Sequence, residues 1–168
     1  ISLGIGQDAL LMTPIQMANI SAIIANRGYY KIPHLMKLTK ESNDNIYNHF
    51  NEKYYCSVDS KYFRPVIYGM ETAISGTYGT AKLAKLSNTK ICGKTGTAQN
   101  PHGKDHSVFI GFAPKKNPKI AIAVYIENGG WGGDVAAPIA SLCIEKYLNK
   151  KISRIDLENL ILDKKINY

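Results

Sequence analysis

The chain has 168 residues, and 21 lysines and arginines against 13 acidic residues give it a formal net charge of +8. This length supports one hydrophobic core and predicts a single domain or part of one. No apolar run is long enough to span a bilayer, and the start lacks both an initiator Met and a signal-peptide pattern, so we expect a piece of a longer protein. The lysines are scattered without an aromatic-basic motif, which argues against nucleic acid as a partner, although a basic face near an anionic membrane or cell-wall polymer fits the charge.

The three cysteines, Cys56, Cys92 and Cys143, are odd in number and have neither metal-like nor framework spacing. We expect Cys92, in an apolar strand, and Cys143, on a helix, to be small buried apolar residues. The count neither supports nor excludes an oxidising compartment.

Two histidines, His102 and His106, are four residues apart, which is one spacing of metal ligands on a helix. Pro101 and Gly103 argue against a helix there, and no third ligand is evident. We therefore expect no metal site and interpret the stretch as a turn between strands, either with exposed histidines or bordering a substrate cleft.

The first predicted helix follows a Gly-rich loop. Thr13 suits an N-cap, Pro14 suits the first helical position, and Gln16 completes a capping box. The helix should run to about Arg27 and end at Gly28. Its apolar residues lie on nearly every side, which predicts a buried core helix.

Residues 29–40 predict an extended segment interrupted by Pro33. Residues 41–62 are polar and rich in Asn and Tyr, which predicts a surface excursion and the most mobile part of the chain. A second helix is predicted over residues 63–75, with its apolar positions facing inward. These positions are Val66, Ile67, Met70 and Ile74.

Three strands are predicted over residues 90–98, 107–113 and 119–126. The short connections between them favour antiparallel neighbours. The last of the three is apolar enough to be central in a sheet. A glycine-rich loop over residues 129–133 follows, and its Trp131 either lines the rim of a site or packs over the end of the sheet.

Asp134 is predicted to cap a helix over residues 135–149 that packs on the sheet. The inward positions of this helix are Val135, Ile139, Leu142, Cys143, Ile144 and Leu148. Residues 153–168 predict a tail helix that docks on its own domain rather than on a partner. Its cap is Ser153 and its apolar stripe is Leu157, Leu160 and Ile161. Helices combined with antiparallel strands predict an α+β fold.

The stretch best suited to chemistry is KICGKTGTAQ at residues 90–99. Lys94 supplies a compact positive charge for a carboxylate or for proton transfer, and Thr95 and Thr97 supply hydroxyl donors beside it. Gly96 lets a ligand backbone approach closely and pair as an added strand. The N–H of Thr97 would then point at a developing oxyanion. These residue types suit the binding of an acidic, extended peptide at a strand edge.

A phosphate-binding P-loop is a competing interpretation of the same stretch. That motif needs a glycine where Asn88 stands and a helix afterwards, whereas Gly96, Pro101 and Gly103 follow. The P-loop is therefore excluded. An ordinary strand end followed by a turn stays open on the tripeptide alone.

The wider sequence resembles a known family. KTG at residues 94–96 is the third signature of penicillin-binding proteins and serine β-lactamases. The motifs that carry the closer resemblance, to class B penicillin-binding proteins, are GKTGTAQ at 93–99, FIGFAP at 109–114, GIGQ at 4–7 and TPIQMA at 13–18. The insert NPHG at 100–103 and the overall run are most like the penicillin-binding protein 2 branch. The resemblance covers about residues 1–150, so we assign residues 1–152 to the C-terminal portion of a transpeptidase domain and 153–168 to a tail helix.

The resemblance implies the β-lactamase/transpeptidase-like fold, an antiparallel sheet of five strands flanked by helices. This chain would supply three strands and the C-terminal helix, and the first two strands would come from sequence that is absent here. The strand at 119–126 would then have an unpaired edge. We therefore expect this chain either beside the N-terminal remainder of the same protein or self-associated through that edge.

The resemblance also implies the chemistry. The family uses a serine nucleophile in S-x-x-K, an S-x-N site and the K-T-G strand, and the first two would lie upstream of this chain. Ser87 and Lys90 form an S-x-x-K match, but Ser87 lies in a turn entering a strand, so we interpret it as a coincidence and expect the chain alone to be inactive. The implied catalytic residues are Lys94 and Thr97, and the implied substrate-binding residues are Thr95, Gly96 and Thr97.

The function implied by the resemblance is that of a peptidoglycan D,D-transpeptidase without a cofactor. The implied partners are peptidoglycan stem peptides, β-lactams and a SEDS-family polymerase. The implied location is the periplasmic side of the inner membrane, with an anchor in an N-terminal segment absent from this chain. A β-lactam sensor domain and a β-lactamase of the same fold stay open as alternatives.

Overall fold

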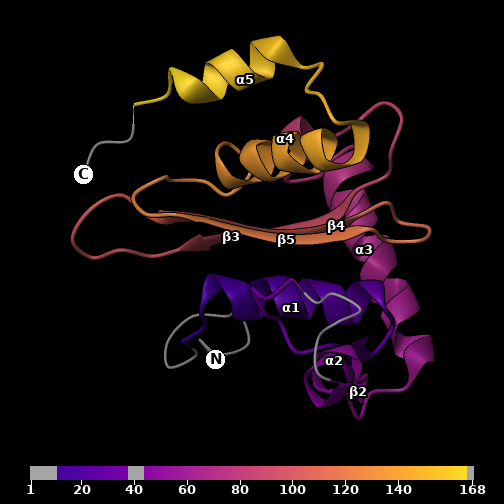
Figure 1. Ribbon diagram of the computed structural model, residues 1–168. Coiled ribbons are helices and arrows are strands. Elements are labelled where there is room, and N and C mark those ends of the chain that lie inside the picture. The colour runs from indigo at the N-terminus through magenta and orange to yellow at the C-terminus, as the bar shows by residue number, and fades with distance from the viewer. Residues whose placement is uncertain (1–10, 38–43, 166–168) are drawn as a thin grey trace.

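The structure is a computed structural model that describes residues 11–37 and 44–165. Its framework is an antiparallel sheet of three strands in the order β3-β4-β5. The strands are β3 (Cys92–Ala98), β4 (His106–Ala113) and β5 (Ile120–Ile126). Helix α1 (Pro14–Ala25) packs on one face and α4 (Ala136–Asn149) on the other, with α5 (Ile155–Leu162) outside α4 (Figure 1). The chain therefore has a layered α+β architecture, as predicted.

Helix α3 (Phe63–Ser75) packs against β3 and contributes to the core on both faces of the sheet. The core on the α1 face consists of Ala25, Phe63, Ile67, Met70, Cys92 and Phe112. The core on the α4 face consists of Ile74, Ala81, Ala84, Leu86, Ile91, Phe109, Ala113, Ala136, Ala137, Ala140 and Ile144. The first turns of α3 thus lie on the α1 side, and its last turn reaches the α4 side.

The remaining elements are short. Strands β1 (Tyr29–Tyr30) and β2 (Tyr54–Tyr55) form an antiparallel pair, and α2 (Asp44–Asn51) precedes β2. Two 3-10 turns, η2 (Ser60–Tyr62) and η3 (Lys82–Ala84), flank α3 in the sequence. The predicted surface excursion over residues 41–62 therefore contains regular structure where it is described, because its tyrosines pair across the small ribbon.

Register assigns the side chains of β3 to the two faces. Lys94 pairs with Ile110, and Thr97 pairs with Ser107. Because side chains alternate along a strand, Lys94 shares the α1 face with Cys92, whereas Thr95 and Thr97 share the α4 face. The predicted charge and the predicted hydroxyls thus lie on opposite faces of one strand.

Two glycines of the sheet make room for a buried ring. The Phe109 side chain is fully buried, and a Cβ built on Gly93 would lie 2.1 Å from its Cζ. A Cβ on Gly111 would lie 2.7 Å from its Cε1. Gly93 and Gly111 face each other in the register, so the ring covers both. The glycine before Lys94 is therefore needed for packing.

The three predicted strands and their antiparallel pairing are confirmed. In the described part of the chain β4 is central and β5 lies at an edge. Whether another chain pairs with that edge stays a prediction. None of the helices within the described ranges has the length and apolarity needed to cross a bilayer.

The helix boundaries were predicted more accurately than helix burial. Helix α3 has the predicted bounds, but Val66 is 46% exposed and does not face inward. Helix α1 begins after Thr13, where the Gln16 side chain accepts a hydrogen bond from the Thr13 N–H at 2.8 Å. The prediction that α1 is buried on every side is wrong, because only one side packs on the sheet and Ile15 is 58% exposed.

Two predicted caps and one predicted burial are also wrong. Val135, not Asp134, is the N-cap of α4, and Arg154, not Ser153, is the N-cap of α5. Cys92 is fully buried as predicted, but Cys143 is exposed, although its neighbours on α4, Leu142 and Ile144, are buried. The tail helix does dock on its own domain, since α5 packs against α4.

Candidate functional site

A groove runs beside β3 at the predicted site residues, Lys94 to Thr97. Its volume is about 570 Å³. The groove is lined by Thr80, Lys94, Thr95, Gly96, Thr97, Trp131, Gly132, Gly133 and Asp134. Among the described residues, no strand pairs with the outer edge of β3. An extended ligand could therefore pair with β3 while its polar end lies in the groove.

The hydroxyls of the groove come from β3, which carries Thr95 and Thr97, and from the loop after α3, which carries Thr80. The Thr95 and Thr80 hydroxyl oxygens lie 2.9 Å apart, and either group can donate to the other. The Thr97 hydroxyl accepts a hydrogen bond from the Gly132 N–H at 3.5 Å. Thr80 was not predicted, because it lies outside the K-T-G motif, 15 residues before Thr95. Hydroxyls arranged in this way suit a carboxylate.

Lys94 is exposed and borders two hollows. Its Nζ donates to the carbonyl oxygen of Thr95 at 2.8 Å, and its side chain also lines an apolar cavity of about 820 Å³ on the α1 face. The apolar cavity lies among α1, α3, β3 and the loop at residues 76–80, and Ile24, Val66, Met70 and Ile110 contribute to its lining. The Lys94 charge is therefore available beside an apolar hollow, opposite the threonine hydroxyls.

The glycine-rich loop over residues 129–133 closes the groove from the α4 side. A Cβ on Gly132 would lie 2.3 Å from the Gly96 carbonyl oxygen and 2.4 Å from that of Val108. A Cβ on Gly133 would lie 2.2 Å from the Thr80 carbonyl oxygen. Only glycine at these two positions lets the loop lie directly on β3 and β4 at Gly132 and on the Thr80 carbonyl at Gly133.

Ser107, on β4, anchors the same loop through hydrogen bonds. Its hydroxyl donates to the Trp131 carbonyl oxygen at 3.0 Å and accepts from the Ala136 N–H at 3.0 Å, so it joins β4 to the start of α4. The Trp131 ring is 74% exposed. Of the two predicted roles of Trp131, this exposure favours the rim of the groove.

The histidine pair does not assemble a metal centre. The Nδ1 of His106 accepts from the Asn128 N–H at 3.1 Å, and its ring contacts that of Tyr125 at a centroid distance of 5.4 Å. Within the described ranges, no group of three or more His, Cys, Asp or Glu side chains is arranged to hold a metal ion.

The S-x-x-K match lies away from the groove. Ser87 lies in a bend between η3 and β3 and lines a different cavity, of about 330 Å³. The match's lysine, Lys90, forms an ion pair with Glu71 at 2.8 Å. This lysine is therefore engaged by a carboxylate, and Ser87 does not begin a helix.

Glu71 is a second feature that the sequence did not reveal. Its carboxylate is largely buried on α3 and pairs with both Lys115 and Lys90. The hydrogen bonds from Lys115 and then Lys90 outweigh burial and lower the pKa of Glu71. The Lys115 N–H also donates to the Lys90 carbonyl oxygen at 2.8 Å. This network fixes the entry to β3, four residues before Lys94.

Comparison with known proteins identifies the family. A model of the penicillin-binding protein transpeptidase domain matches residues 1–145. The peptidoglycan D,D-transpeptidase MrdA of Haemophilus influenzae is 31% identical over 188 residues, and the match covers 98% of this chain and 28% of that protein.

Two solved structures indicate the same family. The structure of Pseudomonas aeruginosa PBP2 in complex with WCK 5153 superposes with a TM-score of 0.75 at 36% identity, covering 91% of this chain and 34% of that one. The imipenem acyl-enzyme complex of penicillin-binding protein A from M. tuberculosis gives 0.66 at 28% identity, covering 88% and 33%. The chain thus spans about a third or less of the length of these relatives. It belongs to the transpeptidase-domain family of class B penicillin-binding proteins, within the penicillin-binding protein 2 type.

Proposed function

We propose that this chain is the substrate-binding part of a serine-type peptidoglycan D,D-transpeptidase. The observation that carries the proposal is the unpaired edge of β3 beside a groove lined by Lys94, Thr95 and Thr97. A D-Ala-D-Ala stem peptide is extended and ends in a carboxylate, so its backbone suits the edge and its carboxylate suits the hydroxyls. The names of the relatives favour transpeptidation over the β-lactam sensor and the β-lactamase.

In the proposed reaction, a serine supplied by the N-terminal remainder of the protein attacks the carbonyl carbon between the two D-alanines. The C-terminal D-alanine leaves as an amine, and an acyl-enzyme forms. The amine of a neighbouring stem then attacks the acyl-enzyme and regenerates the serine. A β-lactam would stop at the acyl-enzyme stage. The proposed sites of action are the periplasmic side of the inner membrane and a complex with a SEDS-family polymerase.

Four residues of β3 have proposed roles. Lys94 lies on the face that borders the apolar cavity, where its charge can stabilise the reacting centre and relay a proton. Thr95 and Thr97 hold the carboxylate, while Gly96 leaves room for the ligand backbone. The N–H of Thr97 would contribute to the oxyanion hole.

The first test is the intact mass of the chain after incubation with a reactive penicillin. We expect no adduct on this chain and one adduct on the intact protein that contains it. An adduct mapped to Ser87 would contradict the proposal that the nucleophile lies outside this chain.

The second test is Lys94→Met in the intact protein. We expect the second-order acylation rate to fall by about 100-fold or more, as when one preorganised electrostatic group is removed from an active site. Lys116→Met is the matched control, because Lys116 is exposed in the turn between β4 and β5 and lines neither the groove nor the apolar cavity. Equal acylation rates in the two variants would exclude a catalytic role for Lys94.

A further inference from the structure

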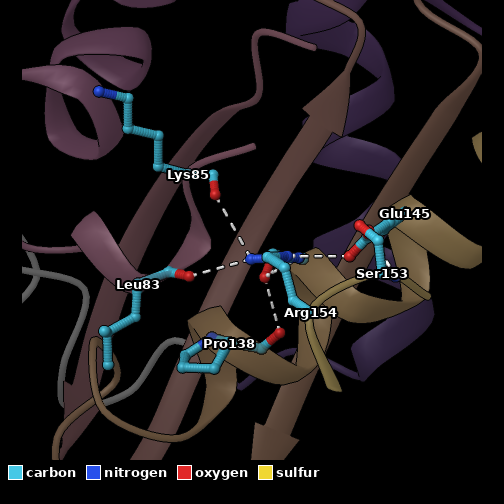
Figure 2. Close-up of polar contacts among 7 residues, drawn as sticks. Leu83, Lys85, Pro138, Glu145, Ser153 and Arg154 are labelled. Atoms are coloured by element: carbon cyan, nitrogen blue, oxygen red, sulfur yellow. Dashed lines mark hydrogen bonds and ion pairs between the residues drawn. The ribbon is translucent and has the colours of Figure 1, made fainter. Parts of the chain in front are cut away.

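Arg154 connects the tail to a loop near the groove. It lies between α4 and α5, beyond the residues that the family model matches, and its side chain is 21% exposed. Its Nε donates to Glu145 Oε2 at 2.9 Å, and one Nη donates to Ser141 Oγ at 3.0 Å (Figure 2). The other Nη donates to the carbonyl oxygens of Leu83 and Lys85 at 3.2 and 3.4 Å. One guanidinium therefore joins α4 to the segment around η3.

The carboxylate of Glu145, which pairs with Arg154, also accepts hydrogen bonds from Ser153. The Glu145 side chain is 2% exposed, and its Oε1 accepts from both the N–H and the hydroxyl of Ser153. Burial acts to raise the pKa of Glu145, but the hydrogen bonds from Ser153 and Arg154 outweigh burial and lower it. The guanidinium is consequently held in place by a charged partner on α4.

Arg154 satisfies carbonyl groups that the 3-10 turn leaves open. Within the turn, the carbonyls of Ala81 and Lys82 accept from the N–H groups of Ala84 and Lys85. The carbonyls of Leu83 and Lys85 instead accept from Arg154. The planar guanidinium can place Nε on Glu145, one Nη on Ser141 and the other Nη on both carbonyls, whereas the ammonium of a lysine has a single nitrogen.

The segment that Arg154 holds begins at a groove residue. Thr80 lies three residues before Leu83, and the next N–H, that of Ala81, donates to the Ala73 carbonyl oxygen at 2.9 Å. The Thr80 hydroxyl contacts that of Thr95 at 2.9 Å. Three anchors therefore determine where this hydroxyl lies: α3 through Ala73, the close packing of Gly133 on the Thr80 carbonyl, and the guanidinium of Arg154.

We propose that Arg154 is a positioning residue for the groove. By holding the Leu83 and Lys85 carbonyls, it fixes the segment from residue 80 to residue 85 so that the Thr80 hydroxyl meets Thr95 and orients it toward a ligand carboxylate. The proposal rests on the proposed function, because it assigns Thr95 to carboxylate binding. It also gives the tail, beyond the matched domain, a role in ligand recognition.

The test is a double-mutant cycle in the intact protein between Arg154→Lys and Thr80→Val. A lysine keeps the ion pair with Glu145 but cannot reach both carbonyls at once. We expect Arg154→Lys to lower the second-order acylation rate with a penicillin by about threefold to tenfold, the range that one hydrogen bond supplies. The rate with the neutral methyl ester of the same penicillin should stay unchanged. In the Thr80→Val background the substitution should have no further effect.

The outcomes are distinct. Additive effects of the two substitutions, or equal losses with the acid and its ester, would overturn the positioning role. A wild-type protein that is not acylated at all would instead overturn the proposed function. The matched control is Arg64→Lys, the same change at an exposed site on α3. If Arg154→Lys does not fold, Ser141→Ala is the second variant, because it removes only one acceptor of the guanidinium. A smaller loss of acylation rate that disappears in the Thr80→Val background would support the positioning role. An unchanged acylation rate in Ser141→Ala would overturn it.

Discussion

Gly132 is the position where a single methyl group tests the contact between the glycine-rich loop and β3. In Gly132→Ala, the added Cβ would lie 2.3 Å from the Gly96 carbonyl oxygen. A carbon–oxygen contact settles at about 3.3 Å, so the loop must lift by about 1 Å. Both clashing atoms are backbone carbonyls of the sheet and cannot rotate away. We expect this overpacking to cost about 1–3 kcal/mol of unfolding free energy.

The same displacement affects the groove. The hydrogen bond from the Gly132 N–H to the Thr97 hydroxyl is already long, at 3.5 Å. Lifting the loop lengthens this distance further, so that the hydrogen bond is lost. The loss of one such bond predicts an acylation rate about threefold to tenfold lower with a penicillin. Urea unfolding and acylation kinetics of the intact protein measure the two effects.

The matched control for this substitution is Gly69→Ala on α3. A Cβ at Gly69 meets nothing within 4 Å, so the alanine should stabilise the helix by about 0.5–1 kcal/mol. Opposite signs of the two stability changes are the expected result. A Gly132→Ala protein with the stability and acylation rate of the wild type would refute the placement of the loop on β3.

Two further predictions concern cysteine reactivity and acid stability. Cys143 should react with a thiol reagent in the native protein at pH 8, whereas Cys92 should react only after unfolding. Burial blocks access to Cys92 and raises the pKa of its thiol to about 11. Peptide mapping of the labelled protein measures this, and labelling of Cys92 in the native protein would contradict it. The second prediction is that Glu71→Gln flattens the pH dependence of stability in acid. The hydrogen bonds from Lys115 and Lys90 lower the pKa of Glu71 in the folded state, so its contribution is present above the unfolded-state pKa of about 4.3 and is lost as pH falls through the folded-state pKa. Urea titrations between pH 6 and 3 measure it, and parallel curves for variant and wild type would exclude the effect.

The sequence predicted elements better than it predicted their surroundings. The bounds of α3 follow from local signals, since its apolar residues repeat at helical spacing and glycine ends it. The exposure of Val66 depends on what packs against α3, which local periodicity cannot reveal. The exposure of Cys143 has the same explanation, because this residue lies on an apolar helix between two buried neighbours, Leu142 and Ile144.

The site was predicted only where it is continuous in sequence. Lys94, Thr95 and Thr97 follow one another along β3, so their motif is visible in the chain. Thr80 and Gly132 reach the same groove from 15 residues before Thr95 and 35 residues after Thr97. Their contacts are set by the register of β3 with β4 and by the start of α4, neither of which a motif encodes.

The surroundings of Lys94 explain why we expect a chain with a complete K-T-G strand to be inactive alone. Proton transfer requires the acid or base to lie within hydrogen-bond reach of the nucleophile. Lys94 borders the apolar cavity on the α1 face, while the threonine hydroxyls lie in the groove on the α4 face. Lys94 also lines the groove, so a nucleophile in either hollow would lie near its side chain, whereas Ser87 lines a different cavity.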